Sequence, residues 1–363
     1  MFKSTKQIRN LYAVSAFSSF QIAGASWVAL LAVRGFSLVQ IGVAECLFHV
    51  TSMLFEIPSG VVSDVFGRKK TMVMSQCFFV LSAFLMMISH SIISIYVALM
   101  LLALGYNFSS GTREALAYDS LKQDGKESEY NKFASMEMMI YRIGGSAAML
   151  CAGLALAIGY QKAYFIDMLL GIFCLCFSFR LKEIPVSEKA TNEKMTKRIL
   201  DCAGSSIHFL LHNRKAMQLM LLNSFVGGIA TLLLFFLQAQ LPLQGLSEAL
   251  LGPALFFMGM GGAIGAKLVT RVPNWSYKKI FVLCTMGVFL CTLTIVTKVP
   301  LIMCAGGFLA ALFDDFLQVR SDILLNSMVP SEQRATLVSV SSFCFSIIMI
   351  ILSPVMGWIF SLI

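Results

Sequence analysis

Charge is scarce in this sequence. Aspartate, glutamate, lysine and arginine together supply 13% of its 363 residues, whereas 58% are hydrophobic. Soluble globular domains carry about 25% charged residues, so that class is excluded. The mean hydropathy of +0.80 indicates a chain whose main solvent is lipid. The net charge of +9 is therefore interpreted as a membrane-topology signal, and no nucleic-acid partner is expected.

Several chemical signatures are also missing. The ten cysteines form no Cys-x-x-Cys pair and no extracellular framework, so we expect free thiols. A glycine-rich phosphate loop ending in Lys and Ser or Thr is absent, which argues against a nucleotide-driven pump. No nucleophile, acid–base pair and metal cluster stand together, and the alternating pattern of a β-barrel is absent. The sequence therefore predicts neither an enzyme nor a cofactor.

Long apolar segments fill most of the chain. A helix of roughly 20 apolar residues crosses a bilayer core about 30 Å thick, and open sheets are excluded because lipid cannot satisfy their backbone groups. We therefore predict an all-α membrane bundle of eleven spans. The segments are 10–32, 38–58, 71–89, 92–117, 133–158, 163–180, 216–240, 249–268, 280–297, 300–325 and 336–361.

Lysine and arginine gather on one side of these spans. The other side holds only Arg34, Lys162 and Lys298. The positive-inside rule then predicts a cytoplasmic N-terminus in the membrane of a cell, with a bacterial cytoplasmic membrane favoured. The cations on the predicted cytoplasmic side are Lys3, Lys6, Arg9, Arg68, Lys69, Lys70, Lys122, Lys126, Lys132, Arg271, Lys278, Lys279, Arg334 and the cluster within 180–215.

A polar stretch near the middle divides the chain. Residues 182–215 are rich in Lys, Glu, Ser and Thr, which predicts a cytoplasmic linker between a six-helix half, 1–181, and a five-helix half, 216–363. His208 and His212 lie one helical turn apart in it. No third ligand is evident, so no metal site is predicted.

The two halves repeat each other weakly. At an offset of 210, Gly35 aligns with Gly245 and Arg68-Lys69 with Lys278-Lys279; at 207, Arg113 aligns with Arg320 and Asp119 with Asn326. Parallel six-helix repeats that rock about a central site are an architecture of secondary transporters.

The segment 60–70 carries a specific motif. Gly60, Asp64, Gly67, Arg68 and Lys69 fit Gly-x-x-x-Asp-x-x-Gly-Arg-Lys, and the segment resembles the signature loop of the major facilitator superfamily. Segments 110–121 and 334–337 resemble its bacterial exporter-like branches. The resemblance implies alternating access, and it implies a twelfth span after the end of this sequence.

Asp64, Arg68 and Asp119 form a predicted cytoplasmic gate. Arg68 is expected to meet Asp119 at the end of the fourth span, and the resemblance implies that this cluster latches the cytoplasmic side closed. The alternative is that Arg68, Lys69 and Lys70 only set topology.

Ionisable residues inside spans are candidates for coupling, because each costs at least ~2.5 kcal/mol at the bilayer centre. Glu45 and His49 form an acid–imidazole pair one turn apart. Asp314 and Asp315 lie near the middle of the tenth span, where such transporters place their sites. Each is a candidate proton carrier or counter-charge for a cationic substrate, and the alternative for the aspartates is structural neutralisation by Arg320.

Further polar residues complete the predicted site. Arg113 either stabilises Glu114 or holds an anionic substrate, and an ordinary ion pair is the alternative. The remaining candidates for cavity lining are Asn107, Asn223, Thr231 and Gln238.

The prediction for function is proton-coupled efflux of a drug-like or amphiphilic small molecule by a monomer surrounded by membrane lipids. The alternatives are proton-coupled uptake of a sugar, peptide or organic anion, and a non-transporting scaffold, sensor or truncated remnant.

Overall fold

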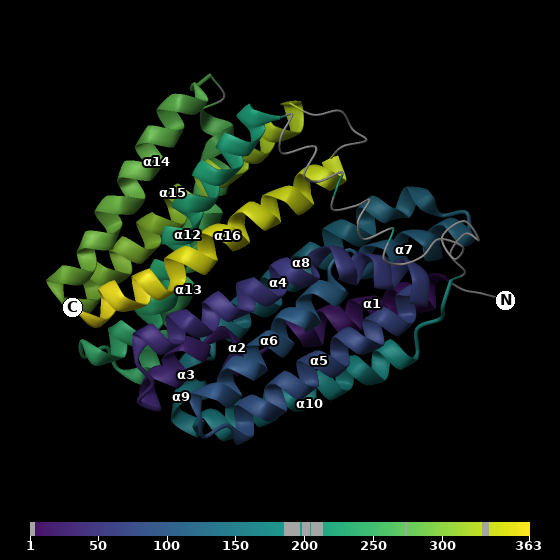
Figure 1. Cartoon of the computed structure of the whole chain (residues 1–363), viewed down its shortest axis with the longest axis horizontal. Helices are drawn as coiled ribbons and strands as arrows, with labels where there is room; N and C mark the ends of the chain where they lie inside the picture. The colour runs from purple at the N-terminus through teal and green to yellow at the C-terminus, as the bar shows by residue number, and fades with distance from the viewer. Residues whose placement is uncertain (1–3, 185–196, 198–203, 205–212, 273, 329–333) are drawn as a thin grey trace. The chain divides into compact units, whose positions relative to one another are not determined.

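The computed structural model describes residues 4–184, 197, 204, 213–272, 274–328 and 334–363, and every regular element in them is helical (Figure 1). His208, His212 and most of the 182–215 linker lie outside the described residues. The helices are α1 (Ser4–Ser19), α2 (Ile22–Ala25), α3 (Trp27–Val33), α4 (Leu38–Phe66), α5 (Arg68–Ile88), α6 (Ile92–Ser109), α7 (Thr112–Gln123), η1 (Glu127–Glu129), α8 (Tyr130–Leu150), α9 (Ala152–Ile158), α10 (Tyr160–Phe179), α12 (Arg214–Leu243), α13 (Glu248–Leu268), η3 (Val269–Arg271), α14 (Tyr277–Thr292), η4 (Leu293–Thr297), α15 (Pro300–Met328) and α16 (Arg334–Ser361).

By its contacts the chain divides into two compact units. Unit 1 comprises residues 1–25, 51–151 and 158–203, and unit 2 comprises 26–50, 152–157 and 204–363. Helix α4 therefore begins in unit 2 and ends in unit 1. The predicted division of the chain at the 182–215 linker was based on the internal repeat, whereas these two units are defined by contacts. The division at the linker therefore stays a prediction.

Nine helices of the described chain are long and apolar enough to cross a membrane, or ten if the bent pair of α8 and α9 is one span. The prediction of an unbroken span at 10–32 is wrong, because this segment is broken into α1, α2 and α3. The break is made by Asp167 of α10, whose carboxylate accepts hydrogen bonds from the amides of Ile22 (2.8 Å) and Gly24 (2.9 Å). Asp167 thus supplies the partners that a new helix start requires.

The 60–70 segment is not the loop that the sequence predicts. Helix α4 continues through Pro58 to Phe66, and α5 begins at Arg68. A single residue, Gly67 with φ of 99°, forms the corner. This conformation is open to glycine and strained for other residues, so one glycine replaces a whole loop.

Two other predicted spans are bent. Segment 92–117 is divided into α6 and α7 at Gly111, which has φ of 70°. Segment 133–158 bends by 48° between α8 and α9. The amide of Cys151 at this bend is shared between the carbonyls of Ala147 and Ala148, so the backbone stays hydrogen-bonded through it.

The core of unit 1 lies where α1, α5, α7, α8 and α10 converge. Its fully buried side chains include Leu11, Met72, Leu116, Phe133 and Leu181. Because lipid is as apolar as these side chains, close van der Waals packing stabilises this core, and the hydrophobic effect adds little. This core fixes the ends of α1 and α10 beside each other.

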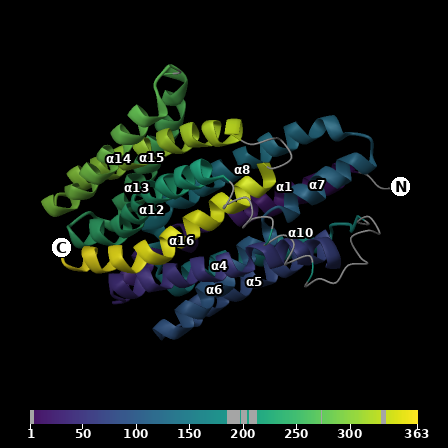
Figure 2. The same ribbon diagram turned by 45° about the horizontal axis from the view of Figure 1, so that its top comes forward.

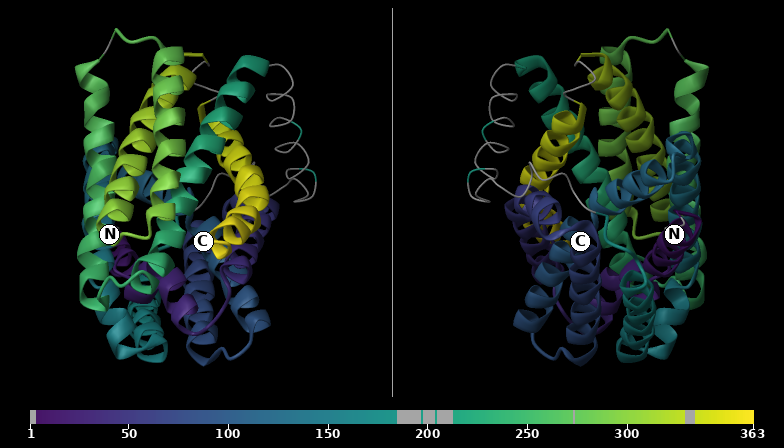
Figure 3. Two further views of the ribbon diagram at one scale, coloured as in Figure 1. Left: turned by 90° about the vertical axis from the view of Figure 1, so that its left-hand side faces the viewer. Right: turned by 90° about the vertical axis from the view of Figure 1, so that its right-hand side faces the viewer.

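Unit 2 packs its helices closely through glycine. Helices α13 and α15 lie side by side, and α16, drawn in yellow, packs along α12 (Figures 2 and 3). A Cβ atom on Gly265 would lie 2.8 Å from the backbone carbon of Leu312, and one on Gly261 would lie 2.9 Å from that of Phe308. Small residues that allow backbones to approach are typical of helix packing in membranes.

The predicted internal repeat has a structural counterpart in two turns. Gly35 and Gly245 both have positive φ, of 85° and 96°. Their amides bond to the carbonyls three residues earlier, and the amides of the next residues, Phe36 and Leu246, bond to the carbonyls five residues earlier. This is the same Schellman helix ending at both aligned positions.

Candidate functional site

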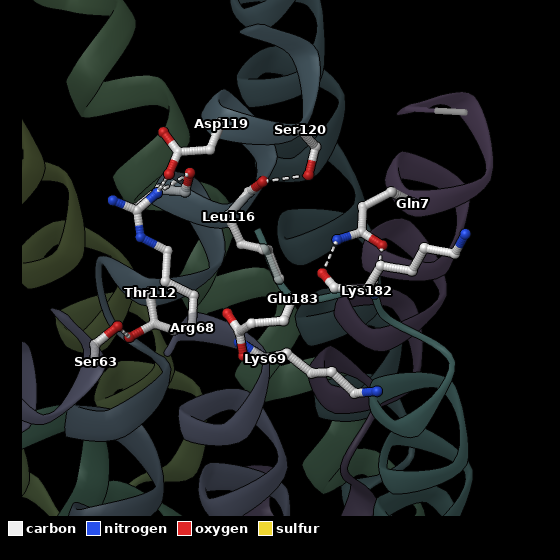
Figure 4. A network of polar contacts seen from close by, with 11 residues as sticks. Gln7, Ser63, Arg68, Lys69, Thr112, Leu116, Asp119, Ser120, Lys182 and Glu183 are labelled. Carbon is white, nitrogen blue, oxygen red and sulfur yellow. Dashed lines mark hydrogen bonds and ion pairs between the residues drawn. The ribbon is translucent and has the colours of Figure 1, made fainter. Parts of the chain in front are cut away.

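The end of unit 1 where α4 turns into α5 carries the predicted gate, and we call it the gate end (Figure 4). Arg68, the first residue of α5, forms an ion pair with Asp119 of α7. Its guanidinium also donates to the carbonyl of Ala115 at 2.7 Å. The side chains of Arg68 and Asp119 are 15% and 26% exposed, so water screens this pair only in part.

Glu183, which the sequence analysis missed, lies at the same gate end. Its carboxylate accepts from the amides of Lys69 (3.2 Å) and Lys70 (3.4 Å) at the N-terminus of α5. A carboxylate there satisfies unpaired donors and complements the helix dipole. Asp64, the other acidic residue of the predicted gate, lies in the last turn of α4. No local pattern links Glu183 to residues over 110 positions earlier.

The structure constrains the two glycines of the motif, Gly60 and Gly67, to different degrees. Gly67 needs its positive φ, and a Cβ atom there would lie 2.6 Å from Glu183. Gly60 lies inside α4, and a Cβ atom on it would meet open space. Packing within the described residues therefore explains Gly67 and leaves Gly60 without a structural reason.

A second charged group lies among α1, α7 and α8 of unit 1. Arg113 forms an ion pair with Glu137 of α8, and its guanidinium is 3.8 Å from Glu114. Ser15 donates to Glu137 at 3.0 Å, which makes Glu137 the centre of the group. Arg113 therefore has two acidic partners. The predicted partner, Glu114, is the more distant one, and Glu137 is the nearer one.

The acid–imidazole pair lies in unit 2. His49 Nε2 is 3.3 Å from Glu45, and its Nδ1 is 3.3 Å from the hydroxyl of Ser346 on α16. The imidazole also meets the ring of Phe345 edge to face, with centroids 5.7 Å apart. Glu45 and His49 are 8% and 7% exposed. Both imidazole nitrogens are therefore in polar contact inside the unit.

Asp314 and Asp315 point to different helices. A Cβ atom built on Gly227 of α12 would lie 3.2 Å from the Asp314 carboxylate, and one on Gly262 of α13 would lie 3.0 Å from Cγ of Asp315. Adjacent residues on a helix project about 100° apart, which explains the divergence. The same position on Gly227 is 4.0 Å from the ring of Phe345, so the Phe345 ring and the Asp314 carboxylate lie on the same side of α12.

A hydrogen-bonded network lies farther along α15, toward its C-terminal end. Asn223 of α12 donates to Gln318 at 2.5 Å and accepts from Ser321 at 3.0 Å. Gln318 donates to Asp322 at 3.2 Å, and Ser321 is 3.4 Å from the Tyr277 hydroxyl. The network connects α12, α14 and α15 through side-chain amides and hydroxyls.

The other predicted cavity residues are dispersed. Asn107 and Ser52 exchange two hydrogen bonds, of 2.6 and 2.9 Å, within unit 1. Thr231 is partly buried on α12, and Gln238 is 7% exposed with its carbonyl oxygen unpartnered among the described residues. Arg320 donates to the carbonyl of Trp275 at 3.0 Å.

One titratable group outside the spans is perturbed. The Asp124 carboxylate accepts a hydrogen bond from the Ser4 amide at 2.7 Å, and hydrogen bonding from Ser4 lowers the pKa of Asp124. A depressed carboxyl pKa stabilises the folded state above its unfolded value of about 3.9, and this contribution is lost as the pH falls through the folded pKa. At neutral pH the bonds anchor the start of α1.

Long apolar helices and buried ionisable side chains together define a multi-pass helical membrane protein with polar groups inside its two units. The sequence matches the Major Facilitator Superfamily over residues 11–295, and the chain belongs to this family. It is a family of secondary transporters, not of enzymes.

Individual relatives agree with this assignment. The chain is 23% identical to the uncharacterized MFS-type transporter YxaM of Bacillus subtilis (strain 168), over 87% of this chain and 79% of that protein. The nucleoside transporter NupG has the same fold, with a TM-score of 0.76, 16% identity, and coverage of 98% of this chain and 91% of that one. A bacterial homologue of the human lysosomal transporter Spinster gives 0.70 at 15% identity, covering 97% and 80%.

Proposed function

We propose that this secondary transporter exports a cationic, amphiphilic small molecule in exchange for protons. The observation that carries the proposal is the sequence of contacts in unit 2 from the Glu45–His49 pair, through the ring of Phe345, to the Asp314 side of Gly227. An aromatic ring in the same region as two carboxylates suits a cation with an apolar body. Acid and imidazole groups inside a membrane protein suit proton transfer.

A single carboxylate is sufficient for exchange. Asp314 lies at the middle of the 29-residue α15. If its carboxylate binds either a proton or the cationic substrate, the two ligands exclude each other, and release of one on one side of the membrane permits binding of the other. That competition gives antiport without a covalent step.

The proposed topology places the gate end in the cytoplasm of a bacterial cell, with the halves 1–181 and 216–363 as the moving repeats. The ion pair of Arg68 with Asp119 would then close the cytoplasmic side in one state. The excess of lysine and arginine on that side supports this orientation.

Uptake of an uncharged polar metabolite is the second candidate. The amide and hydroxyl network of Asn223, Gln318 and Ser321 supports it, because such groups hydrogen-bond sugars and nucleosides. An organic anion is disfavoured, since Arg113 is engaged by Glu137 and Arg320 by the Trp275 carbonyl. Binding of an anion would require these contacts to be replaced.

Proteoliposomes with an imposed pH gradient test the proposal. We expect Asp314→Asn to reduce gradient-driven accumulation of the lipophilic cation ethidium about tenfold or more, and to leave ethidium counterflow without a gradient measurable but weaker, because the lost carboxylate binds both the proton and the cation. Glu248→Gln, which neutralises an exposed carboxylate at the start of α13, is the matched control. Wild-type accumulation in both Asp314→Asn and Asp315→Asn would refute the coupling role. Accumulation of a radiolabelled nucleoside or sugar but not of ethidium would favour uptake.

A further inference from the structure

Unit 1 has a basic hollow on the seam between α1 and α10, which pack against each other. Its volume is about 650 Å³, and we call it the seam pocket. Three of its six lining residues are cations and none is acidic. The lining residues are Lys6, Arg9, Asn10, Ala13, Phe177 and Arg180.

Asn10 distinguishes the seam pocket from a solvated basic patch. Its side chain is 5% exposed, and its amide nitrogen has no hydrogen-bond partner within the described part of the chain. A buried donor without an acceptor destabilises a fold, and natural proteins rarely keep one without a reason. A ligand oxygen in the seam pocket would satisfy it.

The walls of the seam pocket are held in place without a ligand. Gln7 of α1 donates to the carbonyl of Lys182 at 2.8 Å and accepts from the Lys182 amide at 2.9 Å (Figure 4). The guanidinium of Arg180 lies over the ring of Phe177, 5.4 Å from its centroid. Because both helix ends are fixed, binding would require little ordering of the protein.

Charge and apolar surface are separated along the seam. Lys6 and Arg9 lie in the first two turns of α1, and Arg180 follows the last residue of α10. Deeper along the same helices, Phe17 stacks with Phe177 and Phe173, at 5.9 and 5.6 Å between centroids. Phe173 is 51% exposed on the apolar surface of the unit. Cations at helix ends above an exposed apolar surface match a phospholipid, with its phosphate at the interface and its acyl chains below.

We infer that the seam pocket binds the phosphate group of an anionic phospholipid, with Lys6, Arg9 and Arg180 as counter-charges and the Asn10 amide as hydrogen-bond donor. Basic pockets between membrane helices are known to receive such headgroups. Cations that only set topology need neither a hollow nor a buried unpaired amide. The exposed apolar surface below, which includes Phe173, favours a lipid over a soluble phosphate, because only a lipid has acyl chains to cover it.

Native mass spectrometry of the delipidated full-length protein tests the inference. Phosphatidylglycerol and phosphatidylcholine are titrated separately, and we expect the wild type to prefer phosphatidylglycerol. Asn10→Asp, which replaces the donor with a carboxylate, and the double variant Arg9→Gln/Arg180→Gln should each reduce this preference about tenfold. The double variant Arg271→Gln/Lys278→Gln removes the same charge from exposed positions of unit 2 and should keep the wild-type preference.

The outcomes separate the possible explanations. Equal losses in the control double variant, or no preference for phosphatidylglycerol in the wild type, would overturn the site. Displacement of phosphatidylglycerol by millimolar glycerol 3-phosphate or inorganic phosphate would overturn the lipid assignment in favour of a soluble phosphate. Gel filtration and thermal unfolding establish that each variant is folded. Arg9→Gln/Arg180→Gln alters exposed side chains only, so a folding defect in Asn10→Asp would not prevent the test.

Discussion

The gate end of unit 1, at the start of α5, and the aligned corner of unit 2, at the start of α14, are each held together by different kinds of contact. In unit 1, Arg68 at the start of a helix pairs with the carboxylate of Asp119. In unit 2 the positions aligned with Arg68 and Asp119 are Lys278 and Asn326, which cannot form an ion pair, and Arg320, which aligns with Arg113, donates to the backbone carbonyl of Trp275. Only the first contact requires a charge of each sign. A single neutralisation can therefore break the contact in unit 1, whereas the repeat in unit 2 tolerates the loss of that acid.

Charge reversal at the gate end should have the largest effect. Arg68→Asp or Asp119→Arg leaves two like charges facing each other, and we expect each to lower transport about tenfold or more. The double variant Arg68→Asp/Asp119→Arg should recover much of that loss in the proteoliposome assay. Lys278→Asp/Asn326→Arg is the matched change in unit 2 and should have little effect. A double variant no more active than the single variants would remove the pairing from the mechanism.

Glu183→Gln should have an intermediate effect, confined to unit 1. The amide oxygen of glutamine still accepts from Lys69 or Lys70, but its interaction with the dipole of α5 is lost, so we expect a destabilisation of about 0.5–1 kcal/mol. Thermal unfolding in detergent measures it, with Glu129→Gln as an exposed control. The difference should shrink in 1 M salt, where the Debye length is about 3 Å. A difference that is unchanged by salt would mean that the carboxylate acts by packing alone.

Lys279→Gln should destabilise the protein no more than Glu183→Gln does, and it should leave transport unchanged. The Lys279 ammonium lies 4.3 Å from the centroid of the Trp275 ring, and an exposed cation–π contact contributes about 0.5–1 kcal/mol. We expect a slightly lower unfolding temperature and unchanged transport, with the neighbouring Lys278→Gln as control. If Lys279→Gln instead impaired transport as severely as Asp119→Arg, the corner of unit 2 would also depend on charge.

Local patterns predicted the parts of this protein that local forces determine. Hydropathy identified the helical membrane class, and the spacing of Glu45 and His49 correctly indicated a pair on one helical face. The motif indicated the meeting of Arg68 with Asp119, because a resemblance carries information about distant contacts that composition does not.

The rest depends on contacts between distant residues. Three contacts join residues that are far apart in the chain. They are the hydrogen bonds from the amides of α5 to Glu183, the contact of Ser346 with His49, and the ion pair of Glu137 with Arg113. Neither periodicity nor spacing within one segment specifies such partners. For the same reason the corner at Gly67 was predicted as a long loop, since charged residues were given more weight than helical continuity.

Asp167 imposes an order on biosynthesis. The amides of Ile22 and Gly24 can form their hydrogen bonds to Asp167 only after that residue, over 140 positions later in the chain, has been synthesised. At a translation rate of about 5–20 residues per second, roughly 7–30 s pass before the ribosome adds it. During that interval the break between α1 and α3 lacks the carboxylate that accepts its hydrogen bonds, so this early segment can be among the last to acquire its final shape.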